Sequence, residues 1–500
     1  MTDDVSLRRF RWSSEDPADR FPVENPATGE VIAVVQGGGR DQVDAAVRAA
    51  NAAYENDWRW RPPQERSRYL LKCADVLEQH ADEIAVLESL ENGKPISQAR
   101  QFDLAFLIGA FRYFGSLIDK LPGEFYDQGS VFASVILEPL GVVAGIIPFN
   151  WPPIHTGAKV APALAVGNTV VLKPGEQAPL AIMRIVELLE TVLPPDVVHA
   201  VPGIGATTGQ ALVGHPLVRK VSFTGSTKAG AAVTKTAADN ITPVLLELGG
   251  KNAFIVFEDA DLDQAVRDAL EGGYFNQGEA CTASSRVLVQ SAVYDRFVEQ
   301  LAAGVQKLKV GDGADPETHV GPLVTAAQQK RVEEYIEIGR REGARLVAEA
   351  PLPTDPRLAG GFYVAPTLFA DVTRDMRIAQ DEIFGPVVTI IKFDTEDEAV
   401  EIANESEYGL VAGVYTGAMA RGLRVSRRID AGVVFINNYY RMFLGTPFGG
   451  AKHSGYGREH CIQTLQEFGR PKSIRFPSGL GAVPAWSGTT EIFGIGEPSA

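Results

Sequence analysis

Cys281 stands in the segment FNQGEACTASSR, whose residue types suit covalent chemistry at a carbonyl carbon. Its immediate neighbours are alanine and threonine, which are small enough to let a substrate approach the sulfur. A thiolate is a strong nucleophile towards carbonyl carbon. The alternative is a buried, inert thiol, the common state of an isolated cysteine. We interpret Cys73, on or beside an apolar helical stripe, and Cys461, beyond the last motif, in this second way.

Two polar residues follow apolar strand-like runs and could assist such a nucleophile. Glu247 ends the run in LLELGGK, where a partly desolvated carboxylate with a raised pKa can act as a general base. Asn150 lies in PFNWP, and its amide N–H can donate to a developing oxyanion. The alternatives are a Glu247 that caps the following Gly-Gly turn and an Asn150 that forms an Asx-turn before two prolines.

Polar residues at two further strand ends are candidates for holding a dinucleotide. Lys173 and Glu176 in LKPGE can donate to and accept from ribose hydroxyls. A carboxylate there repels a 2′-phosphate, which favours NAD over NADP. Gly225 and Ser226 open the segment GSTKAG, where backbone N–H groups at a helix N-terminus suit a pyrophosphate. The alternative for Lys173 and Glu176 is an exposed turn with an ion pair, and the alternative for Gly225 and Ser226 is an ordinary helix cap.

The elements that must position these residues alternate between short apolar strands and helices. This alternation predicts βαβ units and a parallel sheet covered on both faces, with ligands bound beyond the carboxyl ends of the strands. The expected strands begin at residues 142, 169, 197, 220 and 244. The expected helices span about 155–166, 178–192, 205–213 and 227–238, and two earlier helices span 41–55 and 64–91, the latter stopped by Gly93.

A second α/β run begins near residue 253. It continues through a strand at 286, a helix at 293–308 and a strand at 387–393. The strand formers at 131–137 predict a hairpin-like element, and 351–361 has the composition of a loop. We expect the Gly-, Pro- and Ser-rich tail at 484–500 to be poorly ordered.

Composition excludes several classes of function. The chain has 500 residues, of which 45% are hydrophobic, and a net charge of -16, so neither nucleic acid nor an anionic membrane is an expected partner. Three cysteines without a CxxC pair predict no zinc or other metal site and no disulfide framework, and they fit a reducing compartment such as the cytoplasm. We find neither a signal peptide nor an apolar stretch long enough for a membrane span.

Seven motifs in order resemble those of the NAD(P)-dependent aldehyde dehydrogenase superfamily, and the likeness runs from about residue 20 to about residue 480. They are PFNWP at 148–152, LKPGE at 172–176, FTGS at 223–226, LELGGK at 246–251, NQGEAC at 276–281, EIFGP at 382–386 and PFGG at 447–450. Gly175 and the NNYY run at 437–440 depart from the common pattern and leave the subfamily open.

The resemblance implies a role for each matching position. Cys281 is the implied nucleophile, Glu247 the base, and Asn150 an oxyanion donor together with the Cys281 N–H. The implied cofactor-binding residues are Lys173, Glu176, Gly225, Ser226, Trp151, Glu382 and Phe384. The implied substrate tunnel comprises Phe106, Phe275, Tyr440, Arg441 and Phe443.

The resemblance also implies the domain organisation. A Rossmann-like cofactor domain takes residues 1–119 and 142–249, and an α/β catalytic domain takes 250–446. A small β oligomerisation element takes 120–141 and 470–480, so that a homodimer or homotetramer is expected.

The implied reaction is oxidation of an aldehyde to a carboxylic acid through a thioester on Cys281. Glu247 favours release of a free acid over transfer to coenzyme A. The aromatic tunnel favours an aromatic or medium-chain aliphatic aldehyde, whereas Arg441 leaves open an anionic semialdehyde. A non-catalytic protein on the same scaffold and a thiol redox sensor are the remaining alternatives.

Overall fold

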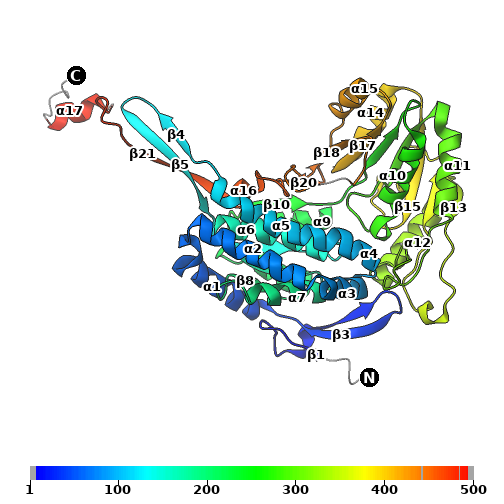
Figure 1. Ribbon diagram of the computed structural model, residues 1–500, viewed down its shortest axis with the longest axis horizontal. Coiled ribbons are helices and arrows are strands. Elements are labelled where there is room, and N and C mark those ends of the chain that lie inside the picture. The colour runs from blue at the N-terminus through cyan, green and yellow to red at the C-terminus, as the bar shows by residue number, and fades with distance from the viewer. Residues whose placement is uncertain (1–6, 441–442, 484, 494–500) are drawn as a thin grey trace.

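The computed structural model describes residues 7–440, 443–483 and 485–493. Figure 1 shows two α/β bodies next to each other and a β arm that projects away from them. The first body carries helices α1 to α7 and strand β8, and the second carries α10 to α15 with strands β13, β15 and β17. The mixed α/β class predicted from strand–helix alternation is confirmed.

The first body is built on a six-stranded sheet with the strand order β20-β10-β9-β6-β7-β8. Its strands are β6 (Val142–Ile146), β7 (Thr169–Lys173), β8 (Val198–Ala200), β9 (Val218–Thr224), β10 (Val244–Glu247) and β20 (Gly455–Tyr456). All neighbouring pairs are parallel except β10 with β20. The register pairs Ile146 with Lys173 and Glu247 with Thr224, so these strands end at one edge of the sheet.

Alternate residues of these strands enter two different apolar cores, because successive side chains of a strand point to opposite faces. Val143 and Val170 pack into one core with Cys73, whereas Val142 and Val171 pack into the other. The helices around the sheet are α1 (Arg40–Asn56), α2 (Pro63–Gln79), α3 (Ala81–Asn92), α5 (Ala105–Leu117), α6 (Pro152–Val166), α7 (Leu180–Glu190), α8 (Gln210–Val213) and α9 (Thr227–Ala238). The strand pattern therefore reads as continuous apolar runs because both faces are covered.

The single helix expected over 64–91 is wrong, because the chain breaks at His80 between α2 and α3. The apolar stripe continues across the break, so periodicity alone does not reveal it. Asp82 and Glu83 lie in the first turn of α3, where carboxylates complement the partial positive charge of a helix N-terminus. Gly93 ends α3 with φ 86°, in the left-handed conformation expected of a stop.

The second body holds a seven-stranded sheet with the order β13-β14-β15-β12-β11-β17-β18, parallel except for β13 with β14. The strands are β11 (Ala253–Val256), β12 (Arg286–Gln290), β13 (Arg345–Glu349), β14 (Thr367–Ala370), β15 (Val387–Phe393), β17 (Val411–Tyr415) and β18 (Val433–Ile436). Its main helices are α10 (Leu262–Tyr274), α11 (Tyr294–Val305), α12 (Ala326–Arg341), α14 (Glu396–Asn404) and α15 (Met419–Ser426).

The projecting arm is a three-stranded antiparallel sheet in which the early hairpin meets the end of the chain. β5 (Val131–Pro139) pairs with β4 (Glu124–Asp127) on one side and with β21 (Gly469–Pro477) on the other. Beyond β21 the expected irregular tail contains a short helix, α17 (Ser487–Phe493), at the end of the arm in Figure 1.

The remaining elements are short. They are β1 (Leu7–Arg8), β2 (Arg20–Asn25) and β3 (Glu30–Gln36) of an N-terminal sheet, the pair β16 (Tyr408–Gly409) and β19 (Ala451–Lys452), and the helices α4 (Ile96–Gln98), α13 (Arg377–Gln380) and α16 (Thr464–Glu467). None of the described helices has the length and apolar character needed to cross a bilayer.

Candidate active site

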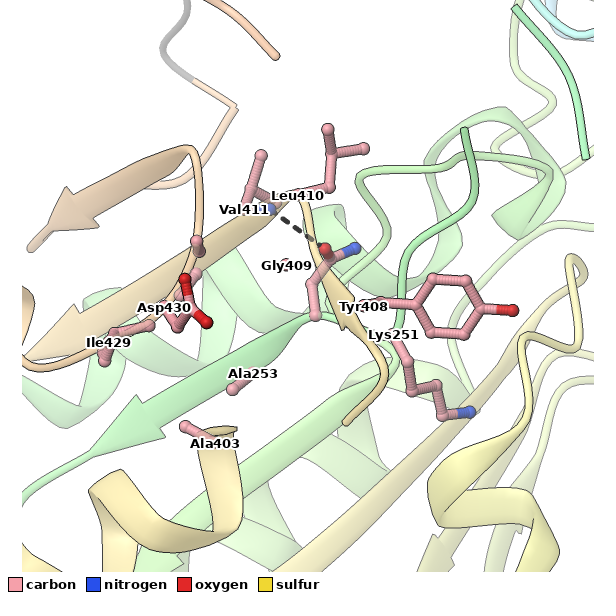
Figure 2. A pocket seen from close by; sticks show the side chains of 12 residues that line it. Lys251, Ala253, Ala403, Tyr408, Gly409, Leu410, Val411, Ile429 and Asp430 are labelled. Carbon is pink, nitrogen blue, oxygen red and sulfur yellow. Dashed lines mark hydrogen bonds between the residues drawn. The ribbon is translucent and has the colours of Figure 1, made fainter. Parts of the chain in front are cut away.

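The nucleophile candidate Cys281 lies in the loop between α10 and β12 of the second body. Before it, Asn276 and Gln277 adopt left-handed backbone conformations, with φ 53° and 55°. Asn252 then holds the loop: its Nδ2 donates to the carbonyls of Cys281 and Ala283, both at 2.8 Å. Asn252 Oδ1 accepts the N–H of Val411 at 3.2 Å, the dashed contact in Figure 2. The loop is thereby tied to strand β17 of the seven-stranded sheet.

The thiol of Cys281 is half-buried beside Trp151 and Ala280 and faces a cavity. Burial raises the pKa of this thiol, and the carboxylates of Glu382 and Glu247 raise it further. The backbone N–H groups of Cys281 and Thr282 act in the opposite direction, because they stabilise negative charge on the sulfur. The same N–H groups suit an oxyanion formed next to the sulfur.

Glu247 ends β10 and is only 3% exposed. Neither carboxylate oxygen has a hydrogen-bond partner among the described residues. Burial raises the pKa of Glu247 well above its usual range and Glu459 adds to this, while Lys159 and Arg458 oppose it. Such a carboxylate is a strong base once ionised, which suits activation of water.

Lys159 and Glu459 form a buried ion pair near Glu247 that the sequence analysis missed. Lys159 Nζ lies 2.9 Å from Glu459 Oε1 and donates to Ser222 Oγ at 3.1 Å. The two residues are 300 positions apart, and each belongs to a segment with no strand-end signal. The only hint in the sequence is an apolar helical segment that carries a lysine, which a buried partner must neutralise.

Asn150 brings the loop after β6 against the Cys281 loop. Its side-chain Nδ2 donates to the carbonyl of Glu279 at 3.0 Å, two residues before the thiol. In return Asn276 Nδ2 donates to the carbonyl of Asn150 at 3.2 Å. These bonds place the predicted oxyanion donor and the predicted nucleophile in one connected unit.

Four of the predicted cofactor residues lie along the carboxyl edge of the six-stranded sheet. Lys173 is 3% exposed, and its Nζ contacts Glu176 Oε2 at 2.8 Å. Gly225 donates its N–H to the carbonyl of Glu247 at 3.1 Å. Ser226 is exposed and caps α9 by accepting the N–H of Ala229 at 3.2 Å. A lysine, an acid and a capped helix N-terminus along one edge fit the parts of a dinucleotide.

Glu382 reaches this edge from the second body. Its Oε1 accepts the N–H of Gly250 at 2.9 Å. Burial raises the pKa of Glu382 to about 7, while the Gly250 N–H, Lys251 and Arg331 lower it. Burial also lowers the pKa of Lys251 to about 7, and this lysine extends next to Tyr408 in Figure 2.

Phe384 is held at φ 62°, a conformation rarely adopted by a phenylalanine. Its ring lies 5.9 Å from that of Phe149, beside the Asn150 loop. The EIFGP and PFNWP motifs therefore meet, although they come from different bodies.

A cavity of about 580 Å³ opens above the thiol. Four predicted tunnel residues, Phe106, Phe275, Tyr440 and Phe443, line it together with Trp151. Trp151 was predicted beside the cofactor and the substrate, and the structure places it in this wall, 7% exposed. The fifth predicted tunnel residue, Arg441, lies outside the described residues.

The cavity wall also contains residues that the sequence analysis did not single out. They include two histidines, His155 on α6 and His460, and the rings of Phe102 and Phe448. The periodicity of α6 places position 155 one turn after Trp151, which is a signal that could have identified His155. His460 carries no comparable signal.

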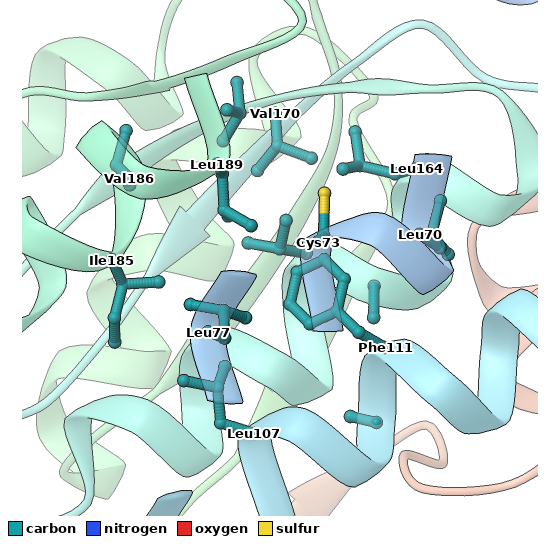
Figure 3. Close-up of a cluster of buried hydrophobic side chains, with 14 of the residues drawn as sticks. Leu70, Cys73, Leu77, Leu107, Phe111, Leu164, Val170, Ile185, Val186 and Leu189 are labelled. Carbon is teal, nitrogen blue, oxygen red and sulfur yellow. The ribbon is translucent and has the colours of Figure 1, made fainter. Parts of the chain in front are cut away.

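The other two cysteines have structural surroundings. Cys73 lies among leucines and Phe111 in the apolar core of the first body, as Figure 3 shows. Cys461 is also buried, and both agree with their interpretation as core residues. Across the part of the chain that the structure describes, three or more His, Cys, Asp or Glu side chains do not gather as metal ligands.

Comparison with known proteins gives a consistent result. The model of the "Aldehyde dehydrogenase family" matches residues 12–474. "Aldehyde dehydrogenase citD" of Monascus ruber is 59% identical over 97% of this chain and 96% of its own length. Betaine aldehyde dehydrogenase of Mesorhizobium japonicum is 40% identical over 95% and 97%. The structure of a Bacillus cereus aldehyde dehydrogenase in complex with NAD+ superposes with a TM-score of 0.89 at 40% identity, covering 92% of this chain and 93% of that one.

Proposed function

The chain belongs to the aldehyde dehydrogenase family and is an NAD-dependent aldehyde dehydrogenase, and we propose that it oxidises aromatic or medium-chain aliphatic aldehydes to the free acid through a thioester on Cys281. The observation that carries the proposal is the convergence of three groups. Cys281 and Asn150 come from two loops joined by the bond from the Asn150 amide to Glu279, and the unpartnered carboxylate of Glu247, at the end of β10, acts electrostatically on the Cys281 thiol.

Chemistry begins at the sulfur of Cys281. The N–H groups of Cys281 and Thr282 stabilise the thiolate, which attacks the aldehyde carbon. The Asn150 amide and the Cys281 N–H then carry the charge of the tetrahedral oxyanion, where one donor typically contributes about 3–4 kcal/mol to the barrier. NAD, when bound, would supply the hydride acceptor. Collapse of the oxyanion would then expel hydride from this carbon and leave the acyl group on Cys281 as a thioester.

Hydrolysis of that thioester is assigned to Glu247. Its buried carboxylate takes a proton from water, the hydroxide attacks the acyl carbon, and the acid leaves as the thiol is restored. Raised basicity supports this assignment, because a carboxylate with an ordinary pKa is a weak base towards water. Transfer to coenzyme A needs no such base.

The residues that would hold NAD are Lys173 and Glu176 at the adenosine ribose, Gly225 and Ser226 at the pyrophosphate, and Glu382 at the nicotinamide ribose. Phe384 would support the nicotinamide ring. The buried Lys173 and its ion-pair partner Glu176 are only three residues apart, so the ammonium group and the carboxylate both lie at the carboxyl edge of the sheet. Glu176 supports a preference for NAD, because its carboxylate repels a 2′-phosphate.

The substrate class follows from the described wall of the cavity. Aromatic rings dominate it, and a cavity of about 580 Å³ lies in the range of small-molecule pockets. The semialdehyde alternative depends on Arg441, and Glu459 lies in the same wall, where it disfavours a substrate carboxylate.

Absorbance of NADH tests the proposal directly. Purified protein should reduce NAD with benzaldehyde and hexanal in the absence of coenzyme A, more slowly with NADP, and the Cys281→Ala variant should not. A higher kcat/KM for succinic semialdehyde than for benzaldehyde would contradict the substrate class. A requirement for coenzyme A would contradict release of a free acid.

We also propose that the β21-β5-β4 sheet joins copies of the chain into a dimer or tetramer, in a reducing cytoplasmic compartment. Phe125, Ile136, Ile474 and Phe476 are exposed on this arm, and large exposed apolar side chains favour association. The three cysteines are free thiols, which fits that compartment. Light scattering of the purified protein gives the oligomer mass.

A further inference from the structure

His460 presents a polar ring to a cavity wall that is otherwise largely aromatic. Its ring stacks on Phe448, with centroids 4.9 Å apart and planes at 14°, and it lies 4.6 Å from the ring of Phe106. The closest charged atom to its Nε2 is Glu459 Oε2 at 3.9 Å, which is too far for a hydrogen bond. Within the described residues, neither ring nitrogen of His460 is hydrogen-bonded.

The backbone holds this ring in place at a cost. His460 has φ 68°, a left-handed conformation that is uncommon for residues other than glycine, although histidine adopts it more readily than most. The carbonyl of His460 accepts the N–H of Gly445 at 2.8 Å, which anchors it to the loop that carries Phe443. The ring is therefore fixed in the wall of the cavity.

His155 repeats the arrangement on α6. It lines the same cavity, is 7% exposed, and neither of its ring nitrogens has a partner among the described residues. Rotation of an imidazole by 180° exchanges ring carbons and nitrogens without changing its shape. Its cavity-facing edge can thus present nitrogen to a ligand.

Both rings are uncharged at neutral pH. Burial lowers the pKa of His460 to about 4, against the opposing effect of Glu459. Burial lowers the pKa of His155 well below its usual range, and the charge of Lys159 adds to this. A neutral imidazole offers one N–H donor and one acceptor nitrogen, which matches a hydroxyl or carbonyl group and gives no charge compensation to an anion.

We propose that His460, with His155 as a second contact, recognises a hydroxyl or carbonyl substituent on the ring system of an aromatic aldehyde. The natural substrate class is therefore a hydroxylated or oxygenated aromatic aldehyde of one or two rings. This inference rests on the proposed oxidation of aldehydes at Cys281 and names the substrate that the same tunnel selects. Buried polar groups left without partners make a site discriminate against analogues that lack the matching group.

The test compares hydroxylated aldehydes with size-matched ethers. Values of kcat/KM are measured for 3- and 4-hydroxybenzaldehyde and hydroxynaphthaldehydes, each against the corresponding methoxy compound. Because a neutral hydrogen bond adds about 0.5–1.5 kcal/mol, the wild type should prefer the hydroxyl compound by about 3- to 10-fold for at least one ring position. The His460→Leu variant should lose this preference, and His460→Gln, which keeps a donor and an acceptor, should restore most of it.

A cofactor-free measurement separates recognition from chemistry. Binding of the same aldehydes to the Cys281→Ser variant, followed by tryptophan fluorescence, should show the same preference and the same loss with His460→Leu. The Ile154→Leu variant is the control, because it changes an apolar wall residue and should keep the hydroxyl-to-methoxy ratio.

An unchanged hydroxyl-to-methoxy ratio in the His460→Leu and His155→Leu variants would overturn the inference. So would a wild-type preference for a trimethylammonium or carboxylate aldehyde over every hydroxylated ring. Failure of the proposed function is distinguishable, since no aldehyde in the panel would then reduce NAD.

Discussion

Gly249 lies against the side chain of Glu382, and its replacement by alanine tests the cofactor-binding role proposed for Glu382. A Cβ at Gly249 would lie 2.3 Å from Oε2, 2.8 Å from Cδ and 2.9 Å from Oε1 of Glu382. The obstacle is a side chain rather than backbone, so the fold can survive. The Glu382 carboxylate must retreat by about 1 Å to reach ordinary van der Waals separation.

That retreat sets the magnitude of the effect. The 2.9 Å bond from the Gly250 N–H to Glu382 lengthens beyond hydrogen-bond range. A carboxylate displaced in this way would also lose the proposed charge-assisted bond to the nicotinamide ribose, and such a bond contributes about 1.5–3 kcal/mol. The Kd for NAD should therefore rise by about 10- to 150-fold in Gly249→Ala.

The assay is an equilibrium titration with NAD, without aldehyde, followed by quenching of tryptophan fluorescence. Gly205→Ala is the matched control, because its Cβ meets no atom within 4 Å. Gly250→Ala gives a contrast, since its Cβ would lie 2.3 Å from the backbone carbonyl oxygen of Cys281 and should disturb the nucleophile loop. If Gly249→Ala binds NAD within twofold of the wild type while remaining folded, the proposed contact of Glu382 is refuted.

Three further outcomes are expected. Glu247→Gln should give a burst of NADH near one equivalent per site and a steady-state rate lower by about 100-fold or more, because only hydrolysis needs the base. An unchanged steady-state rate in stopped-flow absorbance would argue against this role. Burial raises the pKa of Glu382 to about 7, so this carboxylate becomes protonated as the pH falls through that value, and NAD affinity measured from pH 8.5 to 5.5 should weaken at the acidic end. The Glu382→Gln variant should flatten this pH profile. A wild-type profile that is already flat would disprove the link. Cys73→Ser should lower the free energy of unfolding by about 1–3 kcal/mol, since it places a hydroxyl in an apolar core. Urea denaturation measures this change. In the same variant, aldehyde should still protect the thiol of Cys281 from iodoacetamide.

Strands such as β6 and β11 could be predicted because each is an unbroken apolar run, the pattern left by burial on two faces. Strand β13, with charged residues at both ends, and the two-residue β20 could not. The helix break at His80 could not, because the apolar stripe of α2 continues into α3. Helices such as α12 were not anticipated individually. Helix α12 has few buried side chains and a strongly charged surface, which weakens the periodic signal of its apolar residues.

The site was predictable where a polar residue interrupts an apolar run, as Glu247 and Lys173 do at their strand ends. His460, Glu459 and Lys159 were missed for a physical reason. Lys159 and Glu459 pair across 300 residues and His460 packs against the distant Phe106, and nothing in the local sequence records contacts of that range. Asn252 is similar, because its importance lies in carbonyls that it binds in a separate loop.

The pairing of β20 with β10 has a consequence for biosynthesis. Glu247 stands in a strand whose outer neighbour, Gly455–Tyr456, is translated some two hundred residues later. Ser454, immediately before this strand, donates its hydroxyl to the carbonyl of Gly249 at 2.6 Å. During translation, the nascent chain therefore contains the Cys281 loop long before the residues that surround Glu247 have been made. Because pairings of such long range form slowly, we expect closure of this sheet to be a late step in folding.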